Sequence, residues 1–144
     1  MMKLIALFFI IANLASLGHC KYVTCDFDSN FCDYTPNEYF LRYTGKSPSQ
    51  SSGPPYDKTT GQEGYYALCD GRLLKDPAAY CVLDKHVSIA SDAQISFWYF
   101  MFGTQIGTLE FLVDGQVVWS LTGRQEYKWL EATIPLRAGD YQVF

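Results

Sequence analysis

The strongest apolar segment in the interior of the chain is "QISFWYFMF" at residues 94–102. It is rich in aromatic and β-branched residues, and it is too short for a typical long helix. Both features are typical of a buried β-strand. We therefore expect residues 94–102 to lie at the centre of a sheet.

A tight hairpin is predicted further along the chain. The apolar runs "TLEFLV" at residues 108–113 and "QVVWSL" at residues 116–121 flank the dipeptide Asp114-Gly115. A two-residue Asp-Gly link between such runs is the strongest short-range hairpin signal. The two runs are therefore expected to pair as antiparallel strands.

Both faces of this hairpin carry apolar groups. Pairing across the two-residue turn places Glu110 opposite Trp119 and Leu112 opposite Val117. The other face then carries a second apolar set, formed by Leu109, Phe111, Val113 and Val118. Two interpretations remain open: a second face partly covered by the rest of the domain, or an exposed apolar patch used for binding. The candidate binding face consists of Trp119, Glu110, Leu112 and Val117.

The rest of the chain also has a β pattern. Short apolar runs are separated by Gly, Pro, Asn and Asp clusters, and they lie at residues 22–27, 38–43, 64–69, 80–84, 128–134 and 141–144. No amphipathic stretch has the length of a helix. The pattern predicts an all-β fold, an antiparallel jelly-roll sandwich. Residues 44–63 have a Ser/Gly/Pro-rich composition and are expected to form a functional or mobile surface loop.

The first twenty residues have the layout of a secretory signal peptide. Lys3 precedes the apolar run "LIALFFIIANLASL", and small and polar residues follow. The run is shorter than the roughly 20 residues that a membrane-spanning helix needs. Cleavage is possible after Gly18 or after Cys20, and we favour Cys20 because cleavage there removes the odd cysteine. The expected division is therefore a signal peptide at 1–20 and one domain at 21–144.

Composition narrows the class of function. The net charge is −4, hydrophobic residues make up 49% and aromatic residues 17% of the chain. Such a chain can build a substantial core, and it has no basic field that would attract nucleic acid or an anionic membrane surface. Together with the signal-peptide layout, this composition predicts an exported, extracellular protein that does not bind nucleic acid.

The segment "CDFDSNFC" at residues 25–32 is compatible by composition with a metal site, a calcium loop or a disulfide loop. The cysteine spacings do not match zinc knuckles, and the mature chain has a single histidine. An EF-hand fails because Phe31 stands where the turn glycine is required and Asn37 where the bidentate Glu is required. In an exported domain four cysteines form two bridges. Three connectivities are possible, and we choose the neighbour pairs, Cys25 with Cys32 and Cys69 with Cys81.

Catalytic chemistry has little support in the sequence. Asp84, His86 and Ser88 alternate on one strand, where they cannot converge as a nucleophile, base and orienting acid must. A glycosidase needs two carboxylates facing each other across the scissile bond, yet Glu110 is the only acidic residue within its strand. We therefore expect no catalytic residues.

Four segments together resemble one known family. They are "CDFDSNFCDYTPN", "RYTGKSPSQSSGPPYDKTTGQEGYY", "ISFWYFMFGTQIGTLEF" and "WSLTGRQEYKWLEATIPL", in this order between Cys25 and Phe144. This ordered set is similar to the MAM domain family, the extracellular module of meprins, neuropilins and receptor tyrosine phosphatases. The resemblance implies a concanavalin-like jelly roll without catalytic activity. It also implies a role in cell adhesion or protein assembly, within a larger secreted or membrane protein.

The chain departs from the family pattern in three ways. Ile95 stands where the family usually has a cysteine. The pairing of Cys69 with Cys81 is therefore particular to this chain and is not taken from the family pattern. Similar domains continue beyond a strand like "YQVF", so we expect a domain truncated at its C-terminal end. That truncation would leave an unpaired sheet edge beside residues 141–144 and make the chain prone to associate. Membrane attachment would then come only from sequence beyond Phe144.

The resemblance also implies candidate ligands. Members of the family sometimes hold a calcium ion, and the matching positions are Asp28 and Asp57. The alternative is that Asp28 is a solvated strand residue and Asp57 stabilises a turn. The expected partner is an extracellular protein or a second copy of the chain. A calcium-assisted carbohydrate-binding domain is the alternative, with a sugar face formed by Tyr65, Tyr66, Trp119 and Asp57.

Overall fold

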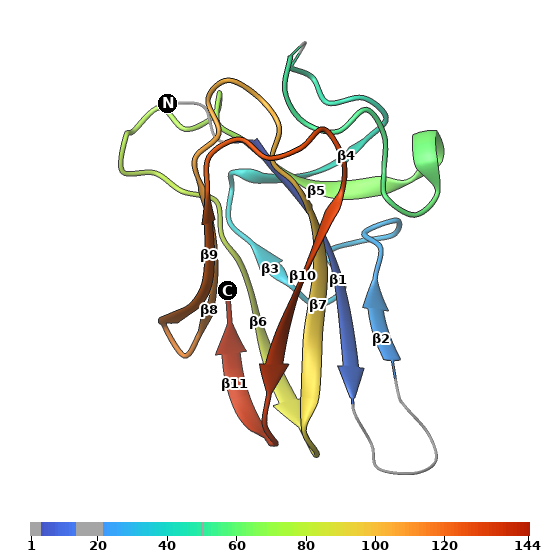
Figure 1. Cartoon of the computed structure of the whole chain (residues 1–144), viewed down its shortest axis with the longest axis vertical. Coiled ribbons are helices and arrows are strands. Elements are labelled where there is room, and N and C mark those ends of the chain that lie inside the picture. The colour runs from blue at the N-terminus through green and yellow to red at the C-terminus, as the bar shows by residue number, and fades with distance from the viewer. Residues whose placement is uncertain (1–3, 14–21, 50) are drawn as a thin grey trace.

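The computed structural model describes residues 4–13, 22–49 and 51–144, and it consists of two facing antiparallel sheets (Figure 1). One sheet has six strands in the order β10-β7-β1-β5-β4, with β2 paired to β1, and the other has the order β3-β6-β11-β8-β9. The predicted disulfide-stapled, all-β antiparallel sandwich is confirmed. The strands are β1 Leu4–Asn13, β2 Tyr22–Cys25, β3 Thr35–Pro36, β4 Phe40–Thr44, β5 Tyr65–Asp70, β6 Leu83–Ile89, β7 Ala93–Phe100, β8 Thr108–Val113, β9 Gln116–Thr122, β10 Leu130–Leu136 and β11 Gly139–Val143.

The main core lies between the two sheets. Strand β7 alternates, and its inward residues include the buried side chains of Ile95, Phe97 and Tyr99. The ring of Phe97 stacks on Phe111 of the opposite sheet, with centroids 5.5 Å apart. Such aromatic pairs add about 0.5–1.5 kcal/mol beyond the area that they bury. Strand β7 lies inside its sheet, between β10 and β1, as the sequence predicted.

A second apolar cluster covers the outer face of the six-stranded sheet. Its buried members are Tyr66, Leu68 and Phe100. The segment at 44–63 runs over this face and is held there by side chains. The indole of Trp129 donates to the carbonyl of Tyr56 at 3.2 Å, and the ammonium of Lys58 lies 4.1 Å from the centroid of the Trp98 ring. Because residues in the segment such as Ser47, Pro54 and Asp57 are buried, it is a packed part of the domain.

Strand β1 is the unexpected element of the six-stranded sheet. It pairs antiparallel with β7 along its length and with β5 and β2 on its other side. It lies within the segment that the sequence assigns to a signal peptide, and the two predicted cleavage points fall outside the described residues. The intact chain and a chain processed after Cys20 would therefore differ at the centre of this sheet. No helix in the described part of the chain is long and apolar enough to span a bilayer.

The sheet position of the C-terminal strand differs from the sequence prediction. Residues 141–144 were expected to border an unpaired edge, but β11 lies inside its sheet between β6 and β8. Phe144 and Leu112 exchange two backbone hydrogen bonds of 3.1 Å. The "YQVF" segment therefore has a strand partner on each side, β6 on one and β8 on the other. The exposed long edge of this sheet is β9 instead.

The predicted hairpin forms, but with a different register. Strands β8 and β9 flank Asp114 and Gly115, both with positive φ (51° and 78°), as a tight hairpin turn requires. Leu112 pairs with Val117 as predicted, whereas Glu110 pairs with Ser120 and not with Trp119. Opposite the step from Phe111 to Leu112, β9 contains one extra residue, a bulge. The residues of β9 after the bulge therefore point to the face opposite to the one predicted. Trp119 therefore turns toward the core, and Val118 is exposed.

Candidate functional site

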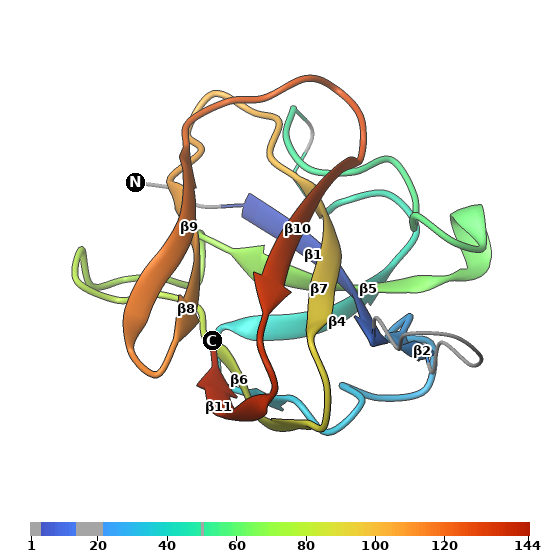
Figure 2. The ribbon, with the colours of Figure 1, turned by 60° about the horizontal axis from the view of Figure 1, so that its bottom comes forward.

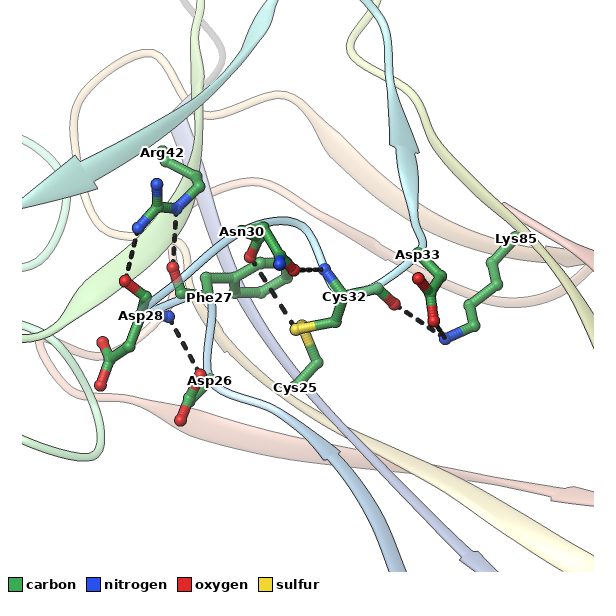
Figure 3. Close-up of a disulfide and its surroundings, with 9 residues drawn as sticks. All are labelled: Cys25, Asp26, Phe27, Asp28, Asn30, Cys32, Asp33, Arg42 and Lys85. Atoms are coloured by element: carbon green, nitrogen blue, oxygen red, sulfur yellow. Dashed lines mark hydrogen bonds and ion pairs between the residues drawn. A yellow bond between two sulfur atoms is a disulfide. The ribbon is translucent and has the colours of Figure 1, made fainter.

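The segment at 25–32 is a disulfide loop (Figure 3). Cys25 is bonded to Cys32, and Cα atoms of the two residues are 5.7 Å apart. Phe27 has a positive φ of 61° and a fully buried side chain that packs edge-on against Phe31. Asn30 accepts the backbone N–H of Cys32 at 2.6 Å. Asp26 and Asn30 therefore cap backbone turns of the loop, and no group of three His, Cys, Asp or Glu side chains that could hold a metal ion occurs among the described residues.

Two cations from other strands hold this loop. The guanidinium of Arg42 donates to the carbonyls of Phe27 at 2.7 Å and Asp28 at 2.6 Å, as Figure 3 shows. It also lies 4.4 Å from the centroid of the Tyr65 ring. Lys85 donates to the carbonyl of Cys32 at 2.8 Å. These contacts could not be predicted from the sequence, because they join residues far apart along the chain.

Replacing Arg42 with Lys is expected to destabilise the domain by about 1–3 kcal/mol, because the second charged hydrogen bond and the stacking over Tyr65 are lost. Urea denaturation of the variant measures this change. Arg137→Lys is the matched control, since Arg137 is an exposed arginine on the chain after β10. Equal stability of R42K and R137K would contradict the proposed role of the two hydrogen bonds that the Arg42 guanidinium donates to the loop.

The two candidate calcium ligands meet at one place. Asp28 accepts the backbone N–H of Tyr65 at 2.8 Å, and Asp57 lies against the neighbouring Gly64, where a side chain would overlap its carboxylate. Asp57 is only 1% exposed. Its Oδ2 accepts the backbone N–H groups of Thr59 at 2.7 Å and Thr60 at 2.9 Å, while its buried Oδ1 has no hydrogen-bond partner. A buried carboxylate oxygen without a donor is what a bound cation would satisfy.

The aromatic residues proposed as a sugar-binding face do not form an exposed surface. Tyr66 is fully buried, and its hydroxyl donates to the carbonyl of Gly45 at 3.1 Å. Burial raises the pKa of Tyr66, so the hydroxyl stays a neutral donor. The Trp119 ring packs edge-on against Phe97 in the core, with centroids 5.2 Å apart. Tyr65 is half-buried beneath Arg42. This arrangement places the three rings in packing roles.

The candidate binding face on the hairpin keeps three of its four members. Glu110 and Val117 are exposed, Leu112 is half-buried, and the strand register puts all three on the outer face of the sheet. Trp119 faces the core, as described above. Val118, which the sequence analysis placed on the opposite face, is 49% exposed and joins the patch through the bulge. A one-residue bulge has no signature in the sequence, so this exchange could not be predicted.

An apolar cavity of about 730 Å³ opens between β8 and the segment before β6. Glu110, Leu112 and Phe144 border it, together with the second disulfide, Cys69–Cys81.

The Cys69–Cys81 disulfide connects β5 to the start of the segment before β6, across residues 70–80. Beside it, the hydrogen-bonded Arg72 guanidinium lowers the pKa of the buried Asp70 carboxyl. The two bridges are those that the sequence analysis chose.

His86 is exposed on β6, on the same face as Asp84 and Ser88. Asp84 accepts the side-chain amide of Gln142 at 3.0 Å. This geometry fits a surface strand and not a converging triad.

Comparison with known proteins identifies the family. The profile described as MAM domain, meprin/A5/mu, matches residues 25–144. The chain therefore belongs to the MAM domain family. Its two disulfides fit the extracellular location of proteins that carry this domain.

Several curated relatives contain similar sequence. Neuropilin-1a of Danio rerio is 28% identical over 151 residues, covering 92% of this chain and 16% of the relative. MAM domain-containing glycosylphosphatidylinositol anchor protein 1 of Rattus norvegicus is 32% identical over 135 residues, covering 86% of this chain and 14% of the relative. MAM domain-containing protein 2 of Mus musculus is 25% identical over 137 residues, covering 82% of this chain and 20% of the relative. This chain thus spans at most a fifth of these relatives. No solved structure matches it.

Proposed function

We propose that this chain is a non-catalytic extracellular module that mediates cell adhesion or protein–protein interaction, as part of a larger secreted or membrane protein. The family match over residues 25–144 carries the proposal. The exposed face formed by Glu110, Val117 and Val118 supports it, because it offers apolar groups beside a polar rim, as protein interfaces do. A glycan would need exposed stacking rings, and the three rings considered for that role are packed.

Probing two arrays tests this proposal. The labelled protein is applied to immobilised ectodomains, the second copy of this chain included, and separately to immobilised glycans. We expect saturable binding to protein and none to glycans. Binding to glycans alone, abolished by EDTA, would replace the proposal with the calcium-assisted lectin.

We further propose that Asp28 and Asp57 contribute to a structural Ca²⁺ site. The support is the buried Oδ1 of Asp57, which has no hydrogen-bond partner, and the position of Asp28, which accepts the backbone N–H of Tyr65, the residue after Gly64. Ca²⁺ takes six to eight oxygen ligands, so backbone carbonyls and water would complete the shell. The ion would neutralise a carboxylate that is otherwise costly to bury.

Excess Ca²⁺ is expected to stabilise the wild-type chain, by about 2.7 kcal/mol at a hundredfold excess over the dissociation constant. The Asp57→Asn variant should lose this response, while Asp140→Asn, at an exposed position of β11, should keep it. Thermal unfolding with CaCl2 and with EDTA measures the response. A wild-type unfolding midpoint that is the same with CaCl2 and with EDTA would contradict the proposed Ca²⁺ site.

A further inference from the structure

The five-stranded sheet is open over part of its length. Strand β11 lies between β6 and β8, but it pairs with β6 only from Gly139 to Val143 and with β8 only around Val143. Figures 1 and 2 show β11 as a short strand at one end of this sheet, while β8 and β9 continue past it. Among the described residues no strand lies between Thr108–Glu110 and Cys81–Leu83. The apolar cavity of about 730 Å³ occupies this place, which we call the sheet slot.

The backbone of β8 points hydrogen-bonding groups into the sheet slot. Leu112 and Phe144 exchange two backbone hydrogen bonds of 3.1 Å, so the N–H and C=O of Leu112 point away from β9. Because these directions alternate along a strand, the same groups of Glu110 and Thr108 point the same way. Both residues lie past the end of β11. Their backbone groups therefore face the slot.

The opposite wall presents a matching row of backbone groups. The backbone N–H of Asn37 donates to the carbonyl of Val82 at 2.9 Å, and the Oδ1 of Asn37 accepts the N–H of Val82 at 3.1 Å. The backbone groups of Val82 thus point away from the slot, and alternation directs those of Cys81 and Leu83 into it. Backbone groups that lack a partner are costly to bury. A single strand between the two walls would pair with both rows.

The inner side of the sheet slot is apolar. Leu83 on one wall and Leu109 and Phe111 on the other are buried and border the cavity. Phe40 and the Cys69–Cys81 disulfide border it from the facing sheet. A strand in the slot would point every second side chain at these groups. Its inward residues must therefore be apolar.

The outer side of the slot carries a carboxylate. Glu110 is exposed and forms no ion pair among the described residues. A strand added beside β8 would place one outward side chain directly opposite Glu110. Opposite charges at such cross-strand positions are favourable, and like charges are unfavourable. The residue that lies opposite Glu110 is therefore best a lysine or an arginine.

We propose that the sheet slot binds an extended segment of a partner polypeptide, which adds as a strand between β8 and Cys81–Leu83. The segment has apolar residues at alternate positions and a basic residue between them, opposite Glu110. Main-chain hydrogen bonds to the sheet hold such a strand, and pockets for alternate side chains select it. The slot is as long as residues 108–111, so it takes about four residues. The inference rests on the proposed protein-recognition function and names its site and the chemistry of its partner.

An α-helix does not fit the sheet slot. The slot is one strand wide where β11 enters it, because β6 and β8 both pair with β11 there. A helix with its side chains is about 10–12 Å across, and its backbone groups are bonded within the helix. It would leave the two rows of backbone groups in the slot unpaired.

An NMR titration of the full ¹⁵N-labelled chain with the peptide Ac-Thr-Val-Lys-Val-Thr-NH2 tests the slot. We expect saturable shifts of the amides of Cys81, Leu83, Thr108 and Glu110, and none in β10. The peptide Ac-Thr-Pro-Lys-Pro-Thr-NH2 should cause no such shifts, because proline lacks the N–H that pairs with the wall. Equal shifts with both peptides would show that apolar groups enter the cavity without adding a strand, and would overturn the inference.

A charge exchange tests the chemistry of the partner. Glu110→Lys should weaken binding of the lysine peptide by about three- to tenfold and improve binding of Ac-Thr-Val-Glu-Val-Thr-NH2. Glu131→Lys is the matched control, since Glu131 is an exposed glutamate on β10 of the other sheet, and it should leave both affinities unchanged. If Glu110→Lys keeps the wild-type preference, the assigned partner chemistry is wrong.

The slot and the proposed function fail in different ways. A chain that binds immobilised ectodomains but gives no peptide shifts would refute the slot and leave the proposed function standing. Binding to glycans alone would remove the proposed function itself. Pairing of the slot walls with residues that follow Phe144 in a longer natural form would also refute the partner, because the chain itself would then fill the slot.

Discussion

A chain that begins at Lys21 is expected to be far less stable in isolation than the chain that includes Leu4–Asn13. Strand β1 pairs with eight residues of β7 and with four each of β5 and β2. Its removal leaves the facing edges of β5 and β7 without partners, in a region where both strands carry buried residues. Each buried backbone group left unpaired costs about 1–3 kcal/mol. The total is comparable with the whole stability of a domain, about 5–15 kcal/mol.

Comparing residues 1–144 and 21–144 by urea denaturation and light scattering measures this effect. The shorter chain should be unfolded or associated. Attaching residues 4–13 after Phe144, through a flexible linker of about 20 residues, should restore a folded species, because the position needs a strand and not a particular connection. The same linker ending in a Gly/Ser segment is the control. A shorter chain that is as stable and monodisperse as the longer one would show that β1 is dispensable.

This comparison also bears on processing. The proposed signal peptide includes β1, so an exported chain beginning at Lys21 would need another strand between β5 and β7. Mass spectrometry of the secreted product identifies its first residue. A product beginning at Lys21 supports export with cleavage after Cys20, and a product beginning at His19 moves the cleavage to Gly18. Retention of Met1 inside the cell would contradict the signal peptide.

Removing the second disulfide is expected to have the next largest effect. Cys69 and Cys81 are 12 residues apart, and in the chain-entropy treatment a loop of this size contributes about 3 kcal/mol. The Cys69→Ala/Cys81→Ala variant should lose this amount and also the packing of Cys69, which is 1% exposed. Removing Cys25 and Cys32, 7 residues apart, should cost slightly less, about 2.5 kcal/mol.

Urea denaturation of the two double variants under oxidising conditions makes this comparison. Peptide mapping of the wild type without reduction establishes the pairing first. The larger loss should belong to the Cys69–Cys81 variant. A Cys32–Cys69 bridge in the map, or equal stability of this variant and the wild type, would contradict the assignment.

Local patterns in the sequence were enough to predict the main elements of the fold. Asp114-Gly115 specifies its turn because both residues tolerate positive φ, and residues 94–102 specify a central strand because they are apolar on both faces. The predicted strand at 80–84 was displaced, since β6 begins at Leu83 and continues to Ile89. The preceding residues instead carry Cys81 to its bridge. Strand boundaries depend on such tertiary partners, which a sequence pattern does not contain.

The candidate sites depended on distant contacts, and the sequence predicted them less well. The conformation of the 25–32 loop is held by Arg42 and Lys85, which lie on other strands. The inward turn of Trp119 follows from one extra residue in β9. The burial of Asp57 comes from the packing of the 44–63 segment, whose Ser/Gly/Pro composition is that of a mobile loop. In each case the deciding interaction joins residues that are separated along the chain.

The central claim is that this extracellular module recognises protein. Binding of the fluorescent, multimerised chain to cells tests it most directly when the cells are treated beforehand with trypsin or with a mixture of glycosidases. We predict that trypsin abolishes binding and that the glycosidases leave it intact. Binding that survives trypsin and disappears after glycosidase treatment would contradict the account.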